Sequence, residues 1–109
     1  MMHRYAVYHA IDLMQMVFPD PSPWHTDRDA NFRRVAVVAA SVEDTPLERI
    51  FRLTNHLDER PWTENAAVVW HDATRPLRST SVGDVAVDED TDEVWMVLPF
   101  GWSKVEPQP

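Results

Sequence analysis

The sequence lacks cysteine and contains only two glycines. Without cysteine the chain has no disulfide, no catalytic thiolate and no Cys-based zinc or iron–sulfur site. With so little glycine, and with neither G-x-x-x-x-G-K-S/T nor G-x-G-x-x-G, the backbone loops that bind nucleotide phosphates are excluded. No apolar run approaches the roughly 20 residues of a membrane helix, and the N-terminus lacks the apolar region of a signal peptide. We therefore expect a cytoplasmic protein with no membrane segment.

Positive charge is also scarce. Ten Lys and Arg residues stand against eighteen Asp and Glu, which gives a net charge of −8. Such a surface repels nucleic acid unless its positive charge is clustered, so the charge argues against direct nucleic-acid binding. It suits a well-solvated protein, a protein that binds a basic protein surface, or a mimic of DNA phosphates.

The length and composition indicate one globular domain. The chain has 109 residues, is 44% apolar and contains five Trp, which is enough for a hydrophobic core. No repeat of 20 to 50 residues is present. We expect residues 1–109 to form a single domain.

Five segments have the composition of β-strands. Val, Ala and Tyr dominate them, and several alternate apolar with polar residues. The predicted strands are Arg4–Ala10, Arg33–Ala40, Ala66–His71, Val82–Asp88 and Val94–Leu98. Trp70 and Trp95 lie on these strands and are expected in the core. The last two strands form an antiparallel hairpin whose tip is an acidic, solvated turn.

One helix is well marked. Thr45 is the expected N-cap, Pro46 the first helical residue, and Glu48 the second member of a capping box. The helix carries one apolar stripe, which predicts packing against one face of a sheet. It is expected to end between His56 and Glu59, before Pro61.

The connection over residues 11–31 is a long loop that contains prolines and a Trp. Ile11–Phe18 could form a short helix or an irregular apolar loop, and three prolines follow closely. Loops of this length are often functional or poorly ordered. Trp24 and Phe18 are expected to hold it against the body of the protein.

Together these elements predict an α+β fold. A single main helix cannot cover both faces of a sheet of about five strands. We expect a curved, mainly antiparallel sheet, partly barrel-like, with the helix packed on its concave side.

The sequence predicts no catalytic residue, no metal site and no cofactor. The five histidines lack H-x-x-x-H or H-x-H spacing. Ser79, Thr80 and Ser81 lie near Asp84 and downstream of His71, but G-x-S-x-G is absent. The favoured interpretation of this segment is a structural turn. In it Gly83 adopts an unusual conformation or packs closely beneath Trp102, and Asp84 accepts N–H bonds or pairs with Arg78.

Aromatic and polar residues on loops are the candidates for binding. An exposed loop Trp marks a protein interface, whereas a buried one closes the end of a small core, and both alternatives stay open here. The candidate interaction residues are Trp24, Asn55, His56, Trp62, Asn65 and Arg78. The candidate structural residues are Ser79, Ser81, Gly83 and Asp84.

Three segments resemble the YodL-like domains of bacterial mobile elements. They are the helix and loop of residues 51–65, the R-S-T-S-V-G-D-V motif that begins at Arg78, and the Phe-Gly-Trp at residues 100–102. The resemblance covers roughly Tyr5 to Val105. It implies an accessory protein of a phage, plasmid or conjugative element, acting in the cytoplasm of the bacterial host. It implies no established activity, cofactor or catalytic residue.

Two functional hypotheses follow. The first is a non-enzymatic phage or mobile-element protein that binds a host or element protein and modulates host defence or physiology. The second is a nucleic-acid-related protein. It would be either an acidic DNA mimic or a binder that uses Arg33, Arg34, Arg75 and Arg78 if these arginines cluster.

Overall fold

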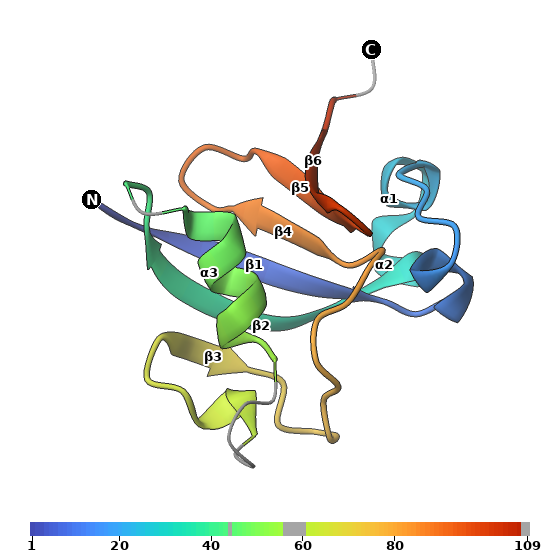
Figure 1. Ribbon diagram of the computed structural model, residues 1–109. Coiled ribbons are helices and arrows are strands. Elements are labelled where there is room, and N and C mark those ends of the chain that lie inside the picture. The colour runs from blue at the N-terminus through green and yellow to red at the C-terminus, as the bar shows by residue number, and fades with distance from the viewer. Residues whose placement is uncertain (44, 56–60, 108–109) are drawn as a thin grey trace.

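The computed structural model describes residues 1–43, 45–55 and 61–107, and Figure 1 shows the chain. Its strands are β1 (Met2–Ala10), β2 (Phe32–Ser41), β3 (Val68–His71), β4 (Val85–Asp88), β5 (Val94–Leu98) and β6 (Gly101–Val105). Its helices are α1 (Ser22–Thr26), α2 (Arg28–Asn31) and α3 (Pro46–Leu53), with short 3-10 helices η1 (Leu13–Met16) and η2 (Trp62–Glu64).

The strands form one six-stranded sheet in the order β3-β2-β1-β4-β5-β6, and every neighbouring pair is antiparallel. The predicted α+β class and antiparallel sheet are confirmed. The predicted number was one strand short because Gly101–Val105 was interpreted as a cap and forms β6. In the described part of the chain the sheet stays open, with β3 and β6 at its edges, so the expected partly barrel-like shape was too loose a description.

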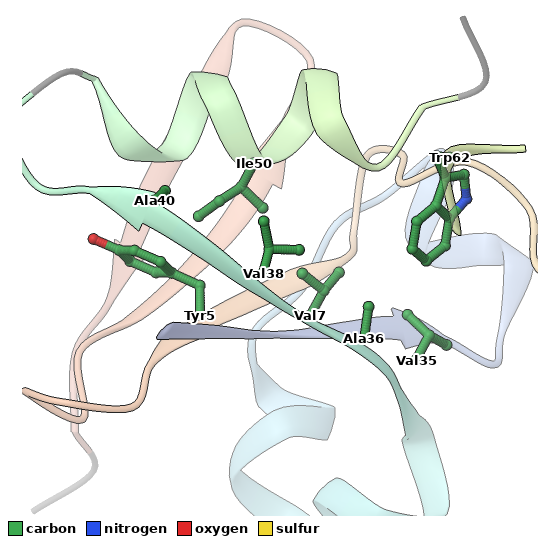
Figure 2. Close-up of a cluster of buried hydrophobic side chains, with 8 residues drawn as sticks. All are labelled: Tyr5, Val7, Val35, Ala36, Val38, Ala40, Ile50 and Trp62. Carbon is green, nitrogen blue, oxygen red and sulfur yellow. The ribbon is translucent and has the colours of Figure 1, made fainter. Parts of the chain in front are cut away.

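Helix α3 covers one face of the sheet, as predicted. Alternate residues of β1 face this side, and Ile50 of α3 packs on Tyr5, Val7 and Val38 (Figure 2). Trp62 closes one end of the same cluster. We call this side the α3 face.

The ends of α3 differ from their prediction. Pro46 is the first helical residue, but Thr45 lies in the left-handed region (φ 38°, ψ 63°) and its side chain makes no capping bond with a described residue. The predicted cap by the Thr45 side chain is therefore wrong, and an N-cap residue normally has an extended backbone, which Thr45 lacks. The helix ends at Leu53, earlier than predicted, and the predicted end between His56 and Glu59 lies outside the described residues.

The opposite face of the sheet is covered at one end by the connection of residues 11–31, which lies beside β6 in Figure 1. This connection is three short helices rather than one long loop, and Ile11–Phe18 contains η1. Trp24 of α1 packs edge-on against Tyr8 and Phe32, at 5.0 and 5.3 Å between ring centroids. We call this side the Trp24 face. Trp24 holds the connection as predicted, whereas Phe18 does not, because it is 70% exposed.

Trp70 departs from its expected place in the core. It lies on β3, an edge strand, and is 43% exposed. Trp95 is only partly buried. The acidic β4–β5 turn is exposed at Glu89, Asp90 and Asp92, as predicted. Among the described residues, no helix has both the length and the apolar composition needed to cross a membrane.

Candidate functional site

The 78–84 turn joins β3 to β4 and is built around the carboxylate of Asp84. Arg78 donates two hydrogen bonds to it, from Nη1 to Oδ2 at 2.6 Å and from Nη2 to Oδ1 at 2.7 Å. The amides of Ser81 and Ala10 donate the third and fourth, at 2.7 and 2.8 Å. Asp84 is fully buried, so these four donors replace the water that a free carboxylate would hold. The predicted pairing with Arg78 and the predicted N–H bonds are both present.

The same turn connects distant parts of the fold. The Arg78 guanidinium also donates to the carbonyls of Ser79 (2.9 Å) and Ala10 (3.3 Å), and the Arg78 carbonyl accepts a bond from the Trp62 indole (3.0 Å). The Thr80 amide donates to the carbonyl of Thr54, just beyond α3 (2.9 Å). The turn therefore fixes the end of β1, η2 and the end of α3 relative to one another.

Gly83 has the unusual conformation that was predicted. Its φ is +90°, and a Cβ there would lie 2.5 Å from the carbonyl oxygen of Gln15. Close packing is thus a second reason why this position requires glycine. The close neighbour is Gln15 of η1, whereas Trp102 was the neighbour predicted. Gln15 is itself buried, and its side chain accepts a bond from the Asp20 amide (2.7 Å). The 78–84 turn therefore also supports the connection of residues 11–31.

His9 lies beside this network without forming a catalytic triad. Its Nε2 is 3.0 Å from the hydroxyl of Thr80 and 3.8 Å from Oδ2 of Asp84. A hydrolase triad needs the carboxylate on the other ring nitrogen and an accessible hydroxyl, whereas Thr80 is only 2% exposed. Burial lowers the pKa of His9 to about 4 despite the attraction of Asp84, and the nearby Arg78 guanidinium acts in the same direction as burial.

Most of the candidate interaction residues make contacts within the fold rather than presenting a free binding surface. Trp24 and Trp62 are 2% and 3% exposed, so the alternative in which they close the core is the one observed. The Asn55 side chain donates to the carbonyl of Phe51 at the end of α3, and the Asn65 side chain accepts a bond from the Ala67 amide at 2.9 Å. His56 lies outside the described residues. Of this set the structure brings together Trp62 and Arg78, while Trp24 lies on the opposite face of the sheet.

Three of the four candidate arginines do cluster. Arg33, Arg75 and Arg78 line a cavity of about 200 Å³ on the α3 face, at the end of β1. Its other walls include Ile11 and Leu13. We call this cavity the arginine pocket.

Arg34 is not part of the arginine pocket. It follows Arg33 on β2 and so points to the Trp24 face. There its guanidinium lies 3.6 Å from Glu89 and 5.1 Å from the centre of the Trp70 ring.

Exposed apolar side chains gather in Ile11–Phe18, which we call the apolar segment. Six large apolar side chains in it are each 40% or more exposed: Ile11, Leu13, Met14, Met16, Val17 and Phe18. Its composition was visible in the sequence, but its exposure was not, because a short apolar stretch is equally compatible with burial.

One group of side chains has the composition of a metal site. Ligand atoms of His3, Asp88 and Asp90 lie within 4.8 Å of one another. However, Nδ1 of His3 is already 2.8 Å from Oδ2 of Asp88, and the carboxylate of Asp90 accepts a bond from the Arg4 amide. Burial raises the pKa of Asp88, but the hydrogen bonds from His3 and from the amides of Asp90 and Thr91 together outweigh burial, so the net pKa is lowered. These contacts account for the group as a set of hydrogen-bonded side chains.

Comparison with known proteins adds no relative: no family model, no curated protein and no solved structure matches the chain.

Proposed function

We propose that this chain is a non-enzymatic binding protein that uses the apolar segment to bind another protein. The observation that carries the proposal is the exposure of six large apolar side chains within eight consecutive residues. Exposed apolar residues scattered singly are normal on a protein surface, whereas contiguous ones mark interaction sites.

Burial of these side chains in an interface would contribute favourably to binding. Leu13 and Phe18 are 66% and 70% exposed, and fully burying side chains of this kind is worth about 1.5–3 kcal/mol each. Together these two side chains contribute at most about 6 kcal/mol, from which the entropic cost of association is subtracted.

The apolar segment is also held in place before any partner binds. The Ile11 amide donates to the Asn31 carbonyl (3.0 Å), Gln15 is buried, and Gly83 contacts the backbone beneath it. A segment fixed in this way loses less conformational entropy on binding than a free loop does.

The proposed partner is a host or element protein in the cytoplasm of a bacterium. This part of the proposal rests on the sequence resemblance to YodL-like domains of mobile elements, which also suggests modulation of host defence or physiology. The absence of catalytic roles is supported by the burial of Thr80 and His9, which are only 2% and 6% exposed.

The test is a comparison of three proteins immobilised and exposed to bacterial lysate: wild type, a Leu13→Ser/Phe18→Ser variant and a Phe100→Ser control. Phe100 is 88% exposed in the β5–β6 turn, outside the apolar segment. We expect wild type and the control to retain the same protein, identified by mass spectrometry, and the double variant to lose it. Equal recovery by all three would refute the apolar segment as the binding surface.

A further inference from the structure

The arginine pocket is adjacent to the apolar segment, and the two share residues. Ile11 and Leu13 belong to the segment and also line the pocket, together with Arg33, Arg75 and Arg78. A partner that covers these two apolar side chains therefore also lies next to the pocket that the three arginines line.

The charges of the pocket are unequally compensated. Arg78 is bound bidentately by Asp84, and Arg75 lies 3.8 Å from the carboxylate of Asp72. Among the residues that the structure describes, the Arg33 side chain makes no hydrogen bond or ion pair, although Asp72 interacts with it at longer range. The neighbouring His9 is neutral above a pKa of about 4. Within the described part of the chain, the pocket thus holds one guanidinium without a direct partner, and the net charge of the sequence is −8.

We propose that the arginine pocket accepts a carboxylate side chain of the bound protein, and that the partner segment is apolar with an Asp or Glu beside its apolar residues. This inference rests on the proposed function and names the chemistry of its partner. A guanidinium recognises a carboxylate through paired N–H donors, and a partly buried site strengthens that bond. The apolar residues of the partner cover Ile11 and Leu13, while its acid reaches Arg33 and the exposed Arg75.

A nucleic acid fits this surface less well. Binding to a phosphate backbone needs several cations that neutralise successive phosphates, but two of the three guanidinium groups here already face carboxylates. Arg34, the fourth candidate, lies on the other face and pairs with Glu89. The six exposed apolar side chains favour a protein segment.

The experiment follows the arginine Nε–Hε signals of the whole isotope-labelled chain by NMR during titration with two capped dipeptides. The probes are N-acetyl-Leu-Glu amide and its matched N-acetyl-Leu-Gln amide. We expect the Glu dipeptide to shift the Arg33 and Arg75 signals saturably, with a dissociation constant of the order of 1 mM. The Arg34 signal should not move.

Matched variants locate the effect. Arg33→Gln should weaken binding of the Glu dipeptide about tenfold, whereas Arg34→Gln, its neighbour on the opposite face, should change it less than about twofold. Equal shifts with the Gln dipeptide, equal shifts at Arg34, or no saturable shift at Arg33 would each overturn the carboxylate pocket.

A third titration uses single-stranded oligothymidylate. If it saturates the Arg33 signal at lower concentration than the Glu dipeptide does, the pocket is a phosphate subsite and the proposal is overturned. The dipeptide result is independent of the lysate comparison. If the Glu dipeptide does not shift the Arg33 signal but the lysate comparison gives its expected result, only the pocket is refuted. If the Arg33 signal shifts but all three immobilised proteins recover the partner equally, only the apolar segment is refuted.

Discussion

The 78–84 turn and the apolar segment are in direct contact, yet they reverse the usual distribution of side chains. The turn is polar and buried, with the Asp84 carboxylate completely enclosed, while the segment is apolar and exposed. The turn can be buried because each charge and N–H around Asp84 has a partner. The segment can stay exposed because its backbone is held by buried neighbours such as Gln15. In this protein, therefore, a polar motif is buried and an apolar segment is exposed.

The largest expected effect is on the turn. Asp84→Ala leaves the Arg78 guanidinium and two amides without their acceptor, so it should lower the free energy of unfolding by about 4 kcal/mol, measured by urea denaturation. Asp29→Ala, an exposed acid of α2, should change it by less than about 0.5 kcal/mol. A loss below about 1 kcal/mol for Asp84→Ala would show that the network is not structural.

The second effect is a pH dependence that originates beside the turn. Burial lowers the pKa of His9 from 6.5 to about 4, so the unfolded chain binds a proton first as the pH falls. The free energy of unfolding should therefore decrease as the pH falls from about 6.5 to about 4, by about 3 kcal/mol in total. Subtracting the urea-denaturation profile of His9→Gln isolates this contribution from that of the carboxylates. Parallel profiles for the two proteins would contradict it.

The third test concerns the contact between the two regions. In Gly83→Ala the new Cβ meets the Gln15 carbonyl at φ +90°, so we expect a loss of about 2 kcal/mol and a displaced η1. Gly101 also has a positive φ (+134°), but a Cβ there meets no described atom within 4 Å. Gly101→Ala should therefore cost only about 1 kcal/mol and leave the amide signals of η1 in place.

The smallest effect on stability is expected in the apolar segment. Leu13→Ser and Phe18→Ser should each change the free energy of unfolding by less than about 0.5 kcal/mol, because both side chains are mostly exposed. Ile50→Ala, in the core beneath α3, should cost about 3 kcal/mol in the same urea titration. A large loss at Leu13 or Phe18 would show that the segment belongs to the core.

Much of the sheet and the main helix was predictable because each carries local patterning. Strand β2 has a continuous Val/Ala run, and α3 begins at Pro46 as expected. Strand β6 was missed because Gly101 and Trp102 looked like a cap, although Trp102 and Lys104 alternate with Ser103 and Val105 as in a strand. The exposure of Trp70 depends on the position of β3 at the sheet edge, and strand order leaves no local signal.

Of the candidate site, only the 78–84 turn was predictable from the sequence. The Arg78–Asp84 pair and the special backbone of Gly83 follow from residue types a few positions apart. The arginine pocket combines Arg33 of β2 with Arg75, which lies more than forty positions further along the chain, so it needs the tertiary fold. Likewise, burial of Trp24 and Trp62 depends on which faces of the sheet the loops cover.

The place of β1 in the sheet has a consequence for how the chain folds. Strand β1 is the first along the chain but pairs with both β2 and β4, and its last residue is bound to Asp84, 74 positions away. Contacts of such long range require large loops to close before they are formed, which slows folding to the range of milliseconds to seconds. During synthesis, one edge of β1 therefore stays unpaired until β4 has left the ribosome. Over that interval the exposed edge is open to association with other chains.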